Sequence, residues 1–308
     1  MTDQANNLRA LMNNRQSDGE KTPAGEASLA RVITISAGKS GVGKSNLAIN
    51  LAIQFIKAGK RCIVIDGDYK HINTTKLLGI EPKYSLKDVV EGNKEISEII
   101  VDGPGGIRLI SGGAGFFKLS GAGDKQKLNP AEYDRQISRF TEKLALLDDI
   151  SDIILIDTGA GMQNQIVDFV SASNEVILVI TPQAESITGA YALIKRAKEK
   201  GDDLPEFNIV TNCVKVDSLG DEIFGKLERA IGKFLHIPLK HIGDLPYDPD
   251  LIKSIKDKQP VSLMYPVSPV ATNTWHIVEH LIDEDRSNIS TLGFKRFMQK
   301  LLVKFNNN

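Results

Sequence analysis

The sequence has few of the features that mark exported, membrane-spanning or nucleic-acid-coating proteins. Its 308 residues include only two cysteines, Cys62 and Cys213, which cannot build a disulfide framework. No apolar run approaches the roughly 18 residues that span a bilayer, and the polar residues after Met1 do not form a signal peptide. Lys and Arg total 38 against 39 Asp and Glu, whereas a protein that coats nucleic acid is strongly basic. We therefore expect an intracellular protein that does not cross a membrane.

What remains is the composition of an ordinary globular protein, with 41% hydrophobic and 25% charged residues. Three zones differ along the chain. Residues 1–28 are polar, and we expect a short helical cluster followed by a flexible linker. Residues 29–285 alternate apolar runs with amphipathic stretches, which predicts one folded domain. Residues 286–308 are basic and amphipathic, which predicts a separate terminal helix.

The middle zone predicts a parallel sheet covered by helices. The expected strands are Val32–Ser36, Cys62–Asp66, Ile107–Ile110, Ile153–Asp157, Val176–Thr181, Asn208–Asn212 and His241–Gly243. The main expected helices are Ser45–Ala58, Pro130–Leu147, Ser186–Lys200 and Ser218–Leu235. Because continuous Val and Ile runs alternate with helices, we expect a single doubly wound α/β fold of mostly parallel strands, with its ligand at their carboxyl ends.

A phosphate-binding loop follows the first expected strand. The segment reads Gly38-Lys39-Ser40-Gly41-Val42-Gly43-Lys44-Ser45, and a helical pattern continues from Asn46. This fits G-x-x-x-x-G-K-[ST] in its strand–loop–helix setting, so the fold is of P-loop NTPase type. The glycines allow backbone N–H groups to surround phosphate oxygens. Lys44 would reach the β- and γ-phosphates, and the Ser45 hydroxyl would ligate Mg²⁺.

Acidic residues end two further strands. Asp66 and Asp68 close the second expected strand, and Asp157 ends the apolar run Ile153–Asp157 as in a Walker B motif, where it would hold Mg²⁺. The next residues would form a switch that senses the γ-phosphate: Thr158, Gly159, Ala160 and Gly161. Positioning, one metal ion and charge neutralisation suffice for phosphoryl transfer to water, so no covalent intermediate is needed.

Lys39 gives the loop a second lysine, as in the deviant-Walker ATPases of the MinD/ParA family, which this chain resembles over nearly its whole length. The resemblance implies an ATP- and Mg²⁺-dependent homodimer in which Lys39 reaches the partner's phosphates in trans. It also implies that Asp68 orients the attacking water and that Asp66 lies near Mg²⁺. Ser40 departs from the family's usual glycine, but it is also small. Lys39, Lys44 and Asp68 are therefore the expected catalytic residues.

The same resemblance suggests where the base binds. Asn212 occupies the place of a family Asn that bonds adenine, and Pro246-Tyr247-Asp248 that of a Pro-x-Asp adenine loop. We therefore add Asn212, Pro246 and Asp248 to the ATP-binding residues of the loop. A guanine-reading Asn-Lys-x-Asp motif is absent, which favours ATP over GTP.

Within the family, the chain is most similar to the FlhG branch, also called FleN or YlxH, which regulates flagellar number. Residues 3–9 match its Asp-Gln-Ala-x-x-Leu-Arg segment, and residues 157–161 match its switch. The resemblance implies that the N-terminal helix stimulates an FlhF-like GTPase, with a flagellar C-ring protein or transcription regulator as other partners. Gln4 would act at the partner's site, while Leu8, Arg9 and Leu11 would contact the partner.

The last residues predict a basic amphipathic helix. Its apolar stripe comprises Phe294, Phe297, Met298, Leu301, Leu302 and Phe305. The other face carries Lys295, Arg296, Lys300 and Lys304, a pattern typical of helices that lie on anionic membranes. One copy would bind marginally, but two copies on a dimer gain avidity of up to about 10²–10⁴-fold. The alternative is a terminal helix packed on the core.

These features together predict a cytoplasmic ATPase that dimerises with ATP, binds the inner face of the cell membrane and regulates flagella. Three alternatives stay open: a MinD-like division-site regulator, a ParA-like partition ATPase that binds DNA without sequence specificity, and a non-catalytic scaffold that binds nucleotide. An iron–sulfur reductase is excluded because Cys62 and Cys213 lack cluster spacing.

Overall fold

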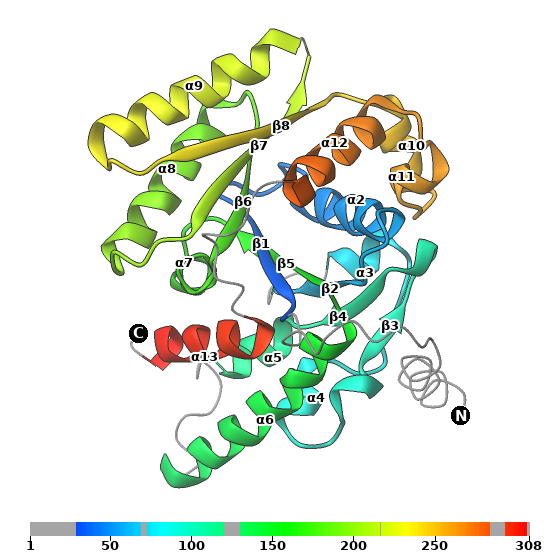
Figure 1. Ribbon diagram of the computed structural model, residues 1–308, viewed down its shortest axis with the longest axis vertical. Helices are drawn as coiled ribbons and strands as arrows, with labels where there is room; N and C mark the ends of the chain where they lie inside the picture. Colours follow the sequence, from blue (N-terminus) through cyan, green and yellow to red (C-terminus); the bar gives the residue numbers. More distant parts are fainter. Residues whose placement is uncertain (1–28, 69–72, 120–129, 216, 284–292, 307–308) are drawn as a thin grey trace, which may run out of the picture.

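The computed structural model describes residues 29–68, 73–119, 130–215, 217–283 and 293–306. Eight strands form one sheet in the order β3-β4-β2-β5-β1-β6-β7-β8 (Figure 1). The strands are β1 (Arg31–Ala37), β2 (Cys62–Asp66), β3 (Ile100–Asp102), β4 (Arg108–Ser111), β5 (Ile153–Ala160), β6 (Glu175–Ile180), β7 (Glu206–Val214) and β8 (Leu239–Pro246). All pairs are parallel except β3 with β4. The predicted doubly wound α/β fold and its seven strands are confirmed.

Helices cover both faces of the sheet. The α-helices are α2 (Lys44–Lys57), α3 (Thr74–Leu77), α4 (Leu86–Val90), α5 (Gly113–Leu119), α6 (Pro130–Ile150), α7 (Asn164–Ala172), α8 (Ala184–Glu199), α9 (Asp217–Phe234), α10 (Pro249–Lys256), α11 (Val261–Met264), α12 (Pro269–Asp283) and α13 (Gly293–Asn306). Two 3₁₀ turns lie at Ile96–Glu98 and Pro104–Gly106. Because successive strand residues point to opposite faces, the fully apolar strands need cover on each side.

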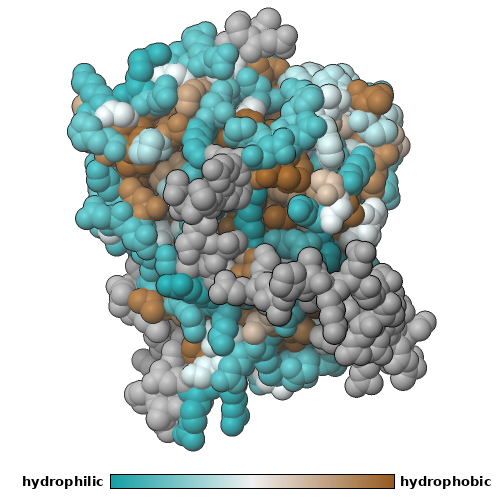
Figure 2. Space-filling view, viewed as in Figure 1, coloured by the Kyte–Doolittle hydropathy of each residue, from teal (hydrophilic) through white to brown (hydrophobic). Residues whose placement is uncertain are grey.

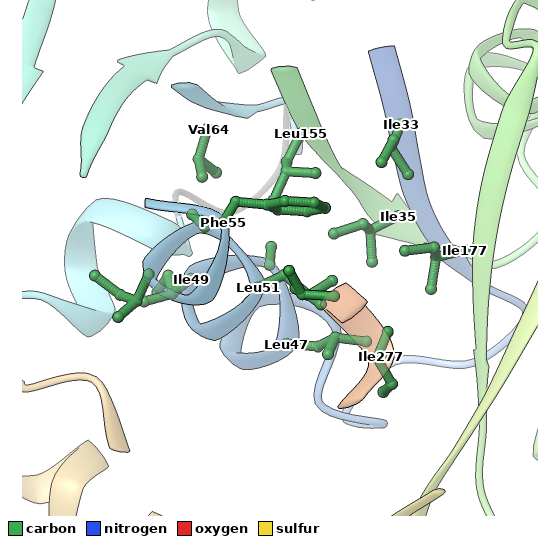
Figure 3. Close-up of a cluster of buried hydrophobic side chains, with 14 of the residues drawn as sticks. Ile33, Ile35, Leu47, Ile49, Leu51, Phe55, Val64, Leu155, Ile177 and Ile277 are labelled. Carbon is green, nitrogen blue, oxygen red and sulfur yellow. The ribbon is translucent and has the colours of Figure 1, made fainter. Parts of the chain in front are cut away.

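The first layer of helices consists mainly of α2 and α12. Phe55 and Leu51 of α2 lie under Ile35, Leu155 and Ile177 of three neighbouring strands (Figure 3). All five side chains are buried. This packing fixes the helix that follows the P-loop against the centre of the sheet. Helix α2 therefore starts at a fixed place beside β1.

The C-terminal helix α13 lies in the second layer, beside α6 and α7 (Figure 1). Its stripe from Phe294 to Phe305 is buried, with each of the six apolar side chains 5% exposed or less. The structure therefore differs from the expected free-standing membrane helix. The amphipathic pattern only specifies an apolar stripe, and here a groove of the same domain covers that stripe. Helix α13 is part of one folded body with the preceding sheet.

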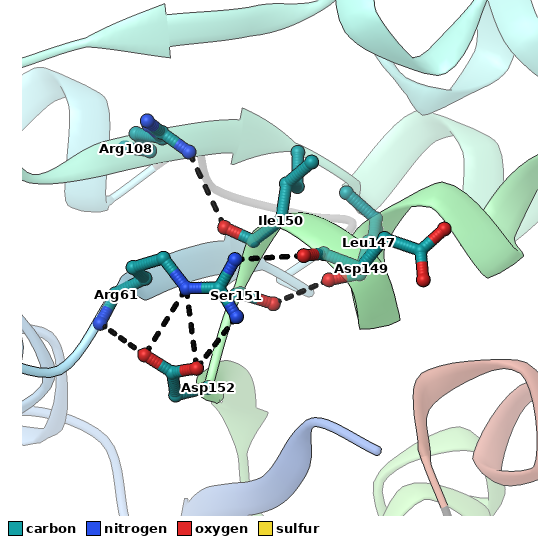
Figure 4. Close-up of polar contacts among 7 residues, drawn as sticks. All are labelled: Arg61, Arg108, Leu147, Asp149, Ile150, Ser151 and Asp152. Atoms are coloured by element: carbon teal, nitrogen blue, oxygen red, sulfur yellow. Dashed lines mark hydrogen bonds and ion pairs between the residues drawn. The ribbon is translucent and has the colours of Figure 1, made fainter. Parts of the chain in front are cut away.

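The N-terminal ends of β2 and β5 are tied together at the edge opposite the P-loop. The Arg61 guanidinium donates to the Asp152 carboxylate at 2.6 Å and to the Asp149 carbonyl at 2.7 Å (Figure 4). Arg108, at the start of β4, also donates to the Ile150 carbonyl. These contacts join the end of α6 to three strands. They fix the relative positions of β2 and β5, whose other ends carry the acidic residues.

Across the described ranges, none of the helices is both long and apolar enough to cross a bilayer. The face in Figure 2 is largely hydrophilic, with apolar atoms in scattered patches.

Candidate functional site

The predicted site residues converge because their strands are neighbours. Strand β5 lies between β2 and β1, so the carboxyl ends of all three meet at one edge of the sheet. In this register Asp66 is paired with Asp157, and Ile35 of β1 is paired with Asp157 from the other side. The P-loop and both acidic strand ends therefore surround one place, as expected for a ligand site of a doubly wound sheet.

The P-loop takes a conformation that requires glycine. Gly41 and Gly43 have φ of 77° and 94°, in the left-handed region that other residues rarely adopt. Gly38 lies directly against Gly189 of α8: a Cβ on Gly38 would come within 1.9 Å of the Gly189 carbonyl carbon. The backbone of the loop is therefore held between α2 and α8. This arrangement leaves its N–H groups available for phosphate at the start of α2.

A cavity of 560 Å³ opens beside the loop. This volume lies within the range of nucleotide and cofactor sites. Its lining consists of Ser40, Gly41, Gly43, Lys44, Ser45, Asn46, Asp68, Asn73, Leu77, Gly159, Ala160, Gln163 and Ile166. The structure thus brings five P-loop residues, Asn46, the predicted catalytic Asp68 and two switch residues to one hollow.

Asp157 lies next to Lys44 and Ser45, two residues that line the cavity, in a state that fits a cation ligand. Both carboxylate oxygens are fully buried and have no hydrogen-bond partner within the described part of the chain. Burial and the nearby Asp66 raise the pKa of Asp157 and Lys44 lowers it, with a net value of about 7. Ser45 also lies close enough to lower this pKa. A buried carboxylate without a partner, next to a hydroxyl, is a donor set that suits Mg²⁺.

Asp66 accepts several hydrogen bonds from residues that follow it in the chain. One carboxylate oxygen accepts the Asp68 N–H at 3.1 Å, and the other accepts the N–H groups of Asn73 and Thr74 and the Thr74 hydroxyl. Burial raises the pKa of Asp66, and these backbone donors lower it. Both Asp66 oxygens thus accept hydrogen bonds from residues at the end of β2 and the start of α3. Metal binding by Ser45, Asp66 and Asp157 stays a prediction.

Asp68 is held at the cavity by a residue to which we assigned no role from the sequence. The Asn73 side-chain amide donates to the Asp68 carboxylate at 3.0 Å. Asp68 is 9% exposed, and a Cβ on Gly159 would lie 3.5 Å from its carboxylate. Gly159 and Asp68 are therefore in van der Waals range of each other. No pattern in the sequence singled out Asn73 as the partner of Asp68.

The predicted switch divides into two parts. Thr158 is buried, and its hydroxyl contacts the Ile35 carbonyl at 3.1 Å, which ties β5 to β1. Gly159 and Ala160 line the cavity. Gly161 donates its N–H to the Ala37 carbonyl at 2.9 Å and has a φ of 111°. The switch therefore leads from the phosphate side of the cavity directly into α7.

Lys39 makes its contacts with residues outside the cavity. Its ammonium group donates to the Gln183 side-chain carbonyl at 2.6 Å and lies 3.6 Å from the Glu185 carboxylate. Lys44, in contrast, is 8% exposed and lies close enough to Asp157 to lower its pKa. The two lysines therefore occupy different surroundings in the single chain.

The predicted adenine residues lie near the loop but have contacts of their own. The Asn212 amide donates to the Val42 carbonyl at 2.7 Å. Asp248 caps α10 by accepting the Asp250 N–H at 2.8 Å, and its other oxygen accepts the Val270 N–H. Pro246 ends β8. Asn212 thus supports the P-loop and Asp248 organises two helix starts, and adenine contact by any of the three stays a prediction.

One group of metal-type ligands lies outside this cavity within the described ranges, at β8 and α9. His241 faces Asp221 through Nδ1 at 3.3 Å and Asp244 through Nε2 at 2.9 Å, while Phe224 stacks on its ring at 4.7 Å. Each ring nitrogen already faces a carboxylate, so the three residues satisfy one another without an ion. We interpret this cluster as an ion-pair network that packs α9 on the sheet.

Sequence comparisons with known proteins identify the family to which the chain belongs. The AAA domain family model matches residues 30–206. The chain is 33% identical over 274 residues to the antiactivator FleN of Pseudomonas aeruginosa, covering 89% of this chain and 94% of FleN. The chain belongs to the MinD/ParA family of ATPases. It is also 26% identical over 306 residues to the flagellum site-determining protein YlxH of Helicobacter pylori, covering 98% of this chain and 99% of YlxH.

Solved MinD structures share the fold. The septum site-determining protein MinD of Pyrococcus horikoshii, solved with Mg-ADP, has a TM-score of 0.60 and 22% identity, covering 83% of this chain and 97% of that one. The comparisons confirm the expected MinD/ParA family and the fold of P-loop NTPase type. The predicted partner residues Gln4, Leu8, Arg9 and Leu11 lie outside the described residues.

Proposed function

We propose that this chain is an ATP-hydrolysing dimerisation switch that regulates the number or placement of flagella. Its similarity to FleN and YlxH extends over nearly the full length of each protein, which supports the flagellar role. The observation that carries the ATPase role is the cavity together with the carboxylate next to it. The cavity is lined by the P-loop lysine and by Asp68, whose carboxylate accepts a hydrogen bond from an amide. The buried Asp157 carboxylate, which has no hydrogen-bond partner in the described part of the chain, lies next to Lys44 and Ser45 of this lining.

Each step of the proposed reaction uses a residue at this cavity. Backbone N–H groups of the P-loop and the Lys44 ammonium bind the phosphates, and Ser45 with Asp157 would hold Mg²⁺. That ion would neutralise charge on the β- and γ-phosphates. Asp68, oriented by Asn73, positions water for attack. Lys39 of one protomer completes the partner's site by stabilising charge as the terminal phosphate leaves.

Membrane binding, in this proposal, depends on whether α13 is docked. Fully burying each apolar side chain of its stripe stabilises the docked helix by about 1.5–3 kcal/mol, more than the partial burial available at a membrane surface. Asp148 of α6 adds contacts with the helix start: it accepts the Phe294 N–H at 2.6 Å and the Lys295 N–H at 3.3 Å. The docked chain would therefore not bind membranes. Release of α13 in the ATP dimer would present two copies to an anionic lipid surface.

The structure offers a direct route from the cavity to α13. Phe169 of α7 lies in the helix that follows the switch, and its ring packs edge-on against Phe305 at 6.1 Å. The same ring lies 3.6 Å from the position of a Cβ on Gly67, the residue between Asp66 and Asp68. A shift of the backbone next to Asp68 would therefore reach α13 through the Phe169 side chain. This packing supports coupling between nucleotide and helix release.

A vesicle assay tests the switch. We expect Asp68→Ala, which binds but does not hydrolyse ATP, to cosediment with vesicles of phosphatidylglycerol and phosphatidylethanolamine in Mg-ATP and to stay in the supernatant in Mg-ADP. Lys39→Ala in the same background should stay in the supernatant in both. Equal sedimentation with both nucleotides would contradict the switch. DNA cosedimentation in Mg-ATP without vesicle binding would instead favour a ParA-like role.

The flagellar branch needs a separate experiment, because the residues concerned lie at positions 1–12. We propose that they stimulate an FlhF-like GTPase through Gln4. A peptide of residues 1–20 should accelerate GTP hydrolysis by the FlhF-like protein of the same genome, and Gln4→Ala should remove the effect. If the peptide leaves the rate unchanged, a MinD-like regulator of another process becomes the better interpretation.

A further inference from the structure

In the single chain, the start of α8 holds the side chain of Lys39. The ammonium group has two acceptors, the Gln183 side-chain carbonyl at 2.6 Å and the Glu185 carboxylate at 3.6 Å. Both acceptors come from the first turn of α8 or the residue just before it. Neither of them is part of the phosphate-binding cavity. We call Gln183 and Glu185 the lysine cradle.

The cradle is fixed relative to the P-loop by backbone contact. A Cβ on Gly189 would lie 2.7 Å from the Gly38 carbonyl oxygen, so the two glycines let α8 approach the start of the loop as closely as backbone allows. Lys39 follows Gly38 directly, and Gln183 lies one and a half turns before Gly189 along α8. The acceptors are therefore set at a constant position beside Lys39 and do not depend on a flexible loop.

The side chain of Gln183 is not used to cap α8, and the carboxyl group of Glu185 carries a negative charge. Gln183 occupies the N-cap position of α8, but its side chain makes no capping hydrogen bond, and the cap contacts go through its backbone carbonyl. Hydrogen bonding to its own N–H lowers the pKa of the Glu185 carboxyl, and Lys39 lowers it further, so Glu185 is negatively charged at neutral pH. A neutral acceptor and a negative charge thus face one ammonium group.

We propose that Gln183 and Glu185 are positioning residues that restrain Lys39 in the monomer and thereby set the protein concentration at which the ATP dimer forms. This inference rests on the proposed trans role of Lys39. A lysine that extends to another chain's phosphate gives up both cradle contacts. The cradle therefore competes with the partner's nucleotide for the same ammonium group.

The expected effect is larger for the dimer than for one chain. Loss of a net hydrogen bond and an exposed ion pair weakens the hold on each lysine by about threefold. A symmetric dimer releases two lysines, so this factor enters the dimerisation constant twice. Removing both cradle groups should therefore tighten dimerisation by about tenfold.

The test compares the full-length double variant Gln183→Met with Glu185→Gln against the wild type. Met keeps the length of Gln and removes the acceptor. The rate of ATP hydrolysis per chain is measured against protein concentration in saturating Mg-ATP, and the dimer is measured by sedimentation with a non-hydrolysable ATP analogue. The double variant should reach half-maximal rate at about tenfold lower protein concentration, with the same maximal rate. Glu199→Gln, which removes a charge from the other end of α8, should behave as wild type.

The possible outcomes distinguish a failure of the lysine-cradle proposal from a failure of the proposed dimerisation switch. An unchanged or higher midpoint concentration, with a wild type that does dimerise, overturns the cradle and leaves the proposed function standing. A higher midpoint would mean that the cradle directs Lys39 toward the partner. If Lys39→Ala in the double variant still dimerises more tightly than Lys39→Ala alone, the effect does not pass through the lysine and the cradle is also overturned. Absence of an ATP dimer in every variant overturns both proposals.

Discussion

Replacing Asp148 by alanine should loosen the C-terminal helix without unfolding the domain. Asp148 lies in α6, yet its carboxylate caps the start of α13 by accepting two backbone N–H groups. Gly293 makes the approach possible, because a Cβ there would lie 3.0 Å from that carboxylate, and its φ of 68° favours glycine. The contact joins α6 and α13, which are far apart in the sequence. Its loss should therefore weaken the docking of α13 on α6.

The size of the effect follows from the bonds lost. Replacing an N-cap acceptor by alanine costs about 0.5–2 kcal/mol, and a buried N–H left without a partner costs about 1–3 kcal/mol. We take about 2 kcal/mol for Asp148→Ala, which corresponds to roughly a 30-fold larger undocked population. The apolar stripe stays intact, so α13 should still be docked in most molecules.

Hydrogen exchange measures this directly, because local opening exposes the amides of one element at a time. Amides of α13 should exchange about 30-fold faster in Asp148→Ala, while those of α2 keep their protection. Asp149→Ala is the matched control, since this neighbouring side chain is exposed and its contact with Arg61 uses the backbone carbonyl. Equal exchange of α13 in variant and wild type would refute the capping role. Equal acceleration in α13 and α2 would show global destabilisation instead.

Three further changes test other parts of the account. Gly189→Ala should lower the free energy of unfolding, measured in urea, by about 1–3 kcal/mol and should weaken ATP binding, because the added Cβ meets P-loop backbone that cannot move aside. Gly232→Ala is the control: a Cβ there has open space, so neither the stability nor ATP binding should decrease. Burial lowers the pKa of His241, but two neighbouring carboxylates outweigh it and raise the pKa above its usual value. The resulting stabilisation is complete below about pH 6.5 and is lost as pH rises through the raised pKa, so His241→Gln should flatten the decline in unfolding free energy from pH 6 to 8. Asn73→Ala should reduce the ATPase rate about tenfold, with unchanged nucleotide affinity, because it removes the hydrogen bond from Asn73 that orients Asp68.

The sheet could be predicted because its strands are buried on both faces. Continuous apolar runs such as Ile153–Asp157 admit few other interpretations when helices separate them. Strand β3 was missed because it has three residues, lies at the edge and runs antiparallel to β4, so its pattern is too short to recognise. Several short helices were missed for the same reason: α3 and α11 have only four residues each.

The site was predicted by residue type and position, but its internal contacts were not. A P-loop followed by acidic strand ends predicts which residues meet, since parallel strands end at one edge. The sequence does not show that Asp66 uses both oxygens within its own loop, or that Asn73 holds Asp68. These contacts depend on loop conformation, which residue spacing does not specify.

The C-terminal helix shows most clearly what a sequence pattern cannot predict, namely which surface covers an apolar stripe. An apolar stripe opposite basic residues is equally suited to a lipid surface and to a groove in the same protein. The decisive feature is the packing of α13 against α6 and α7, which depends on the tertiary structure. Its cap at Asp148 lies more than 140 residues before Phe294, beyond any local pattern.

The oligomeric state of Asp68→Ala in Mg-ATP tests the central claim most directly. Sedimentation velocity should find a dimer in Mg-ATP, a monomer in Mg-ADP, and a monomer in both nucleotides when Lys39→Ala is added. That result would show that the terminal phosphate of ATP joins two chains through Lys39. A monomer in Mg-ATP, or a dimer that ignores both the nucleotide and Lys39, would contradict the account.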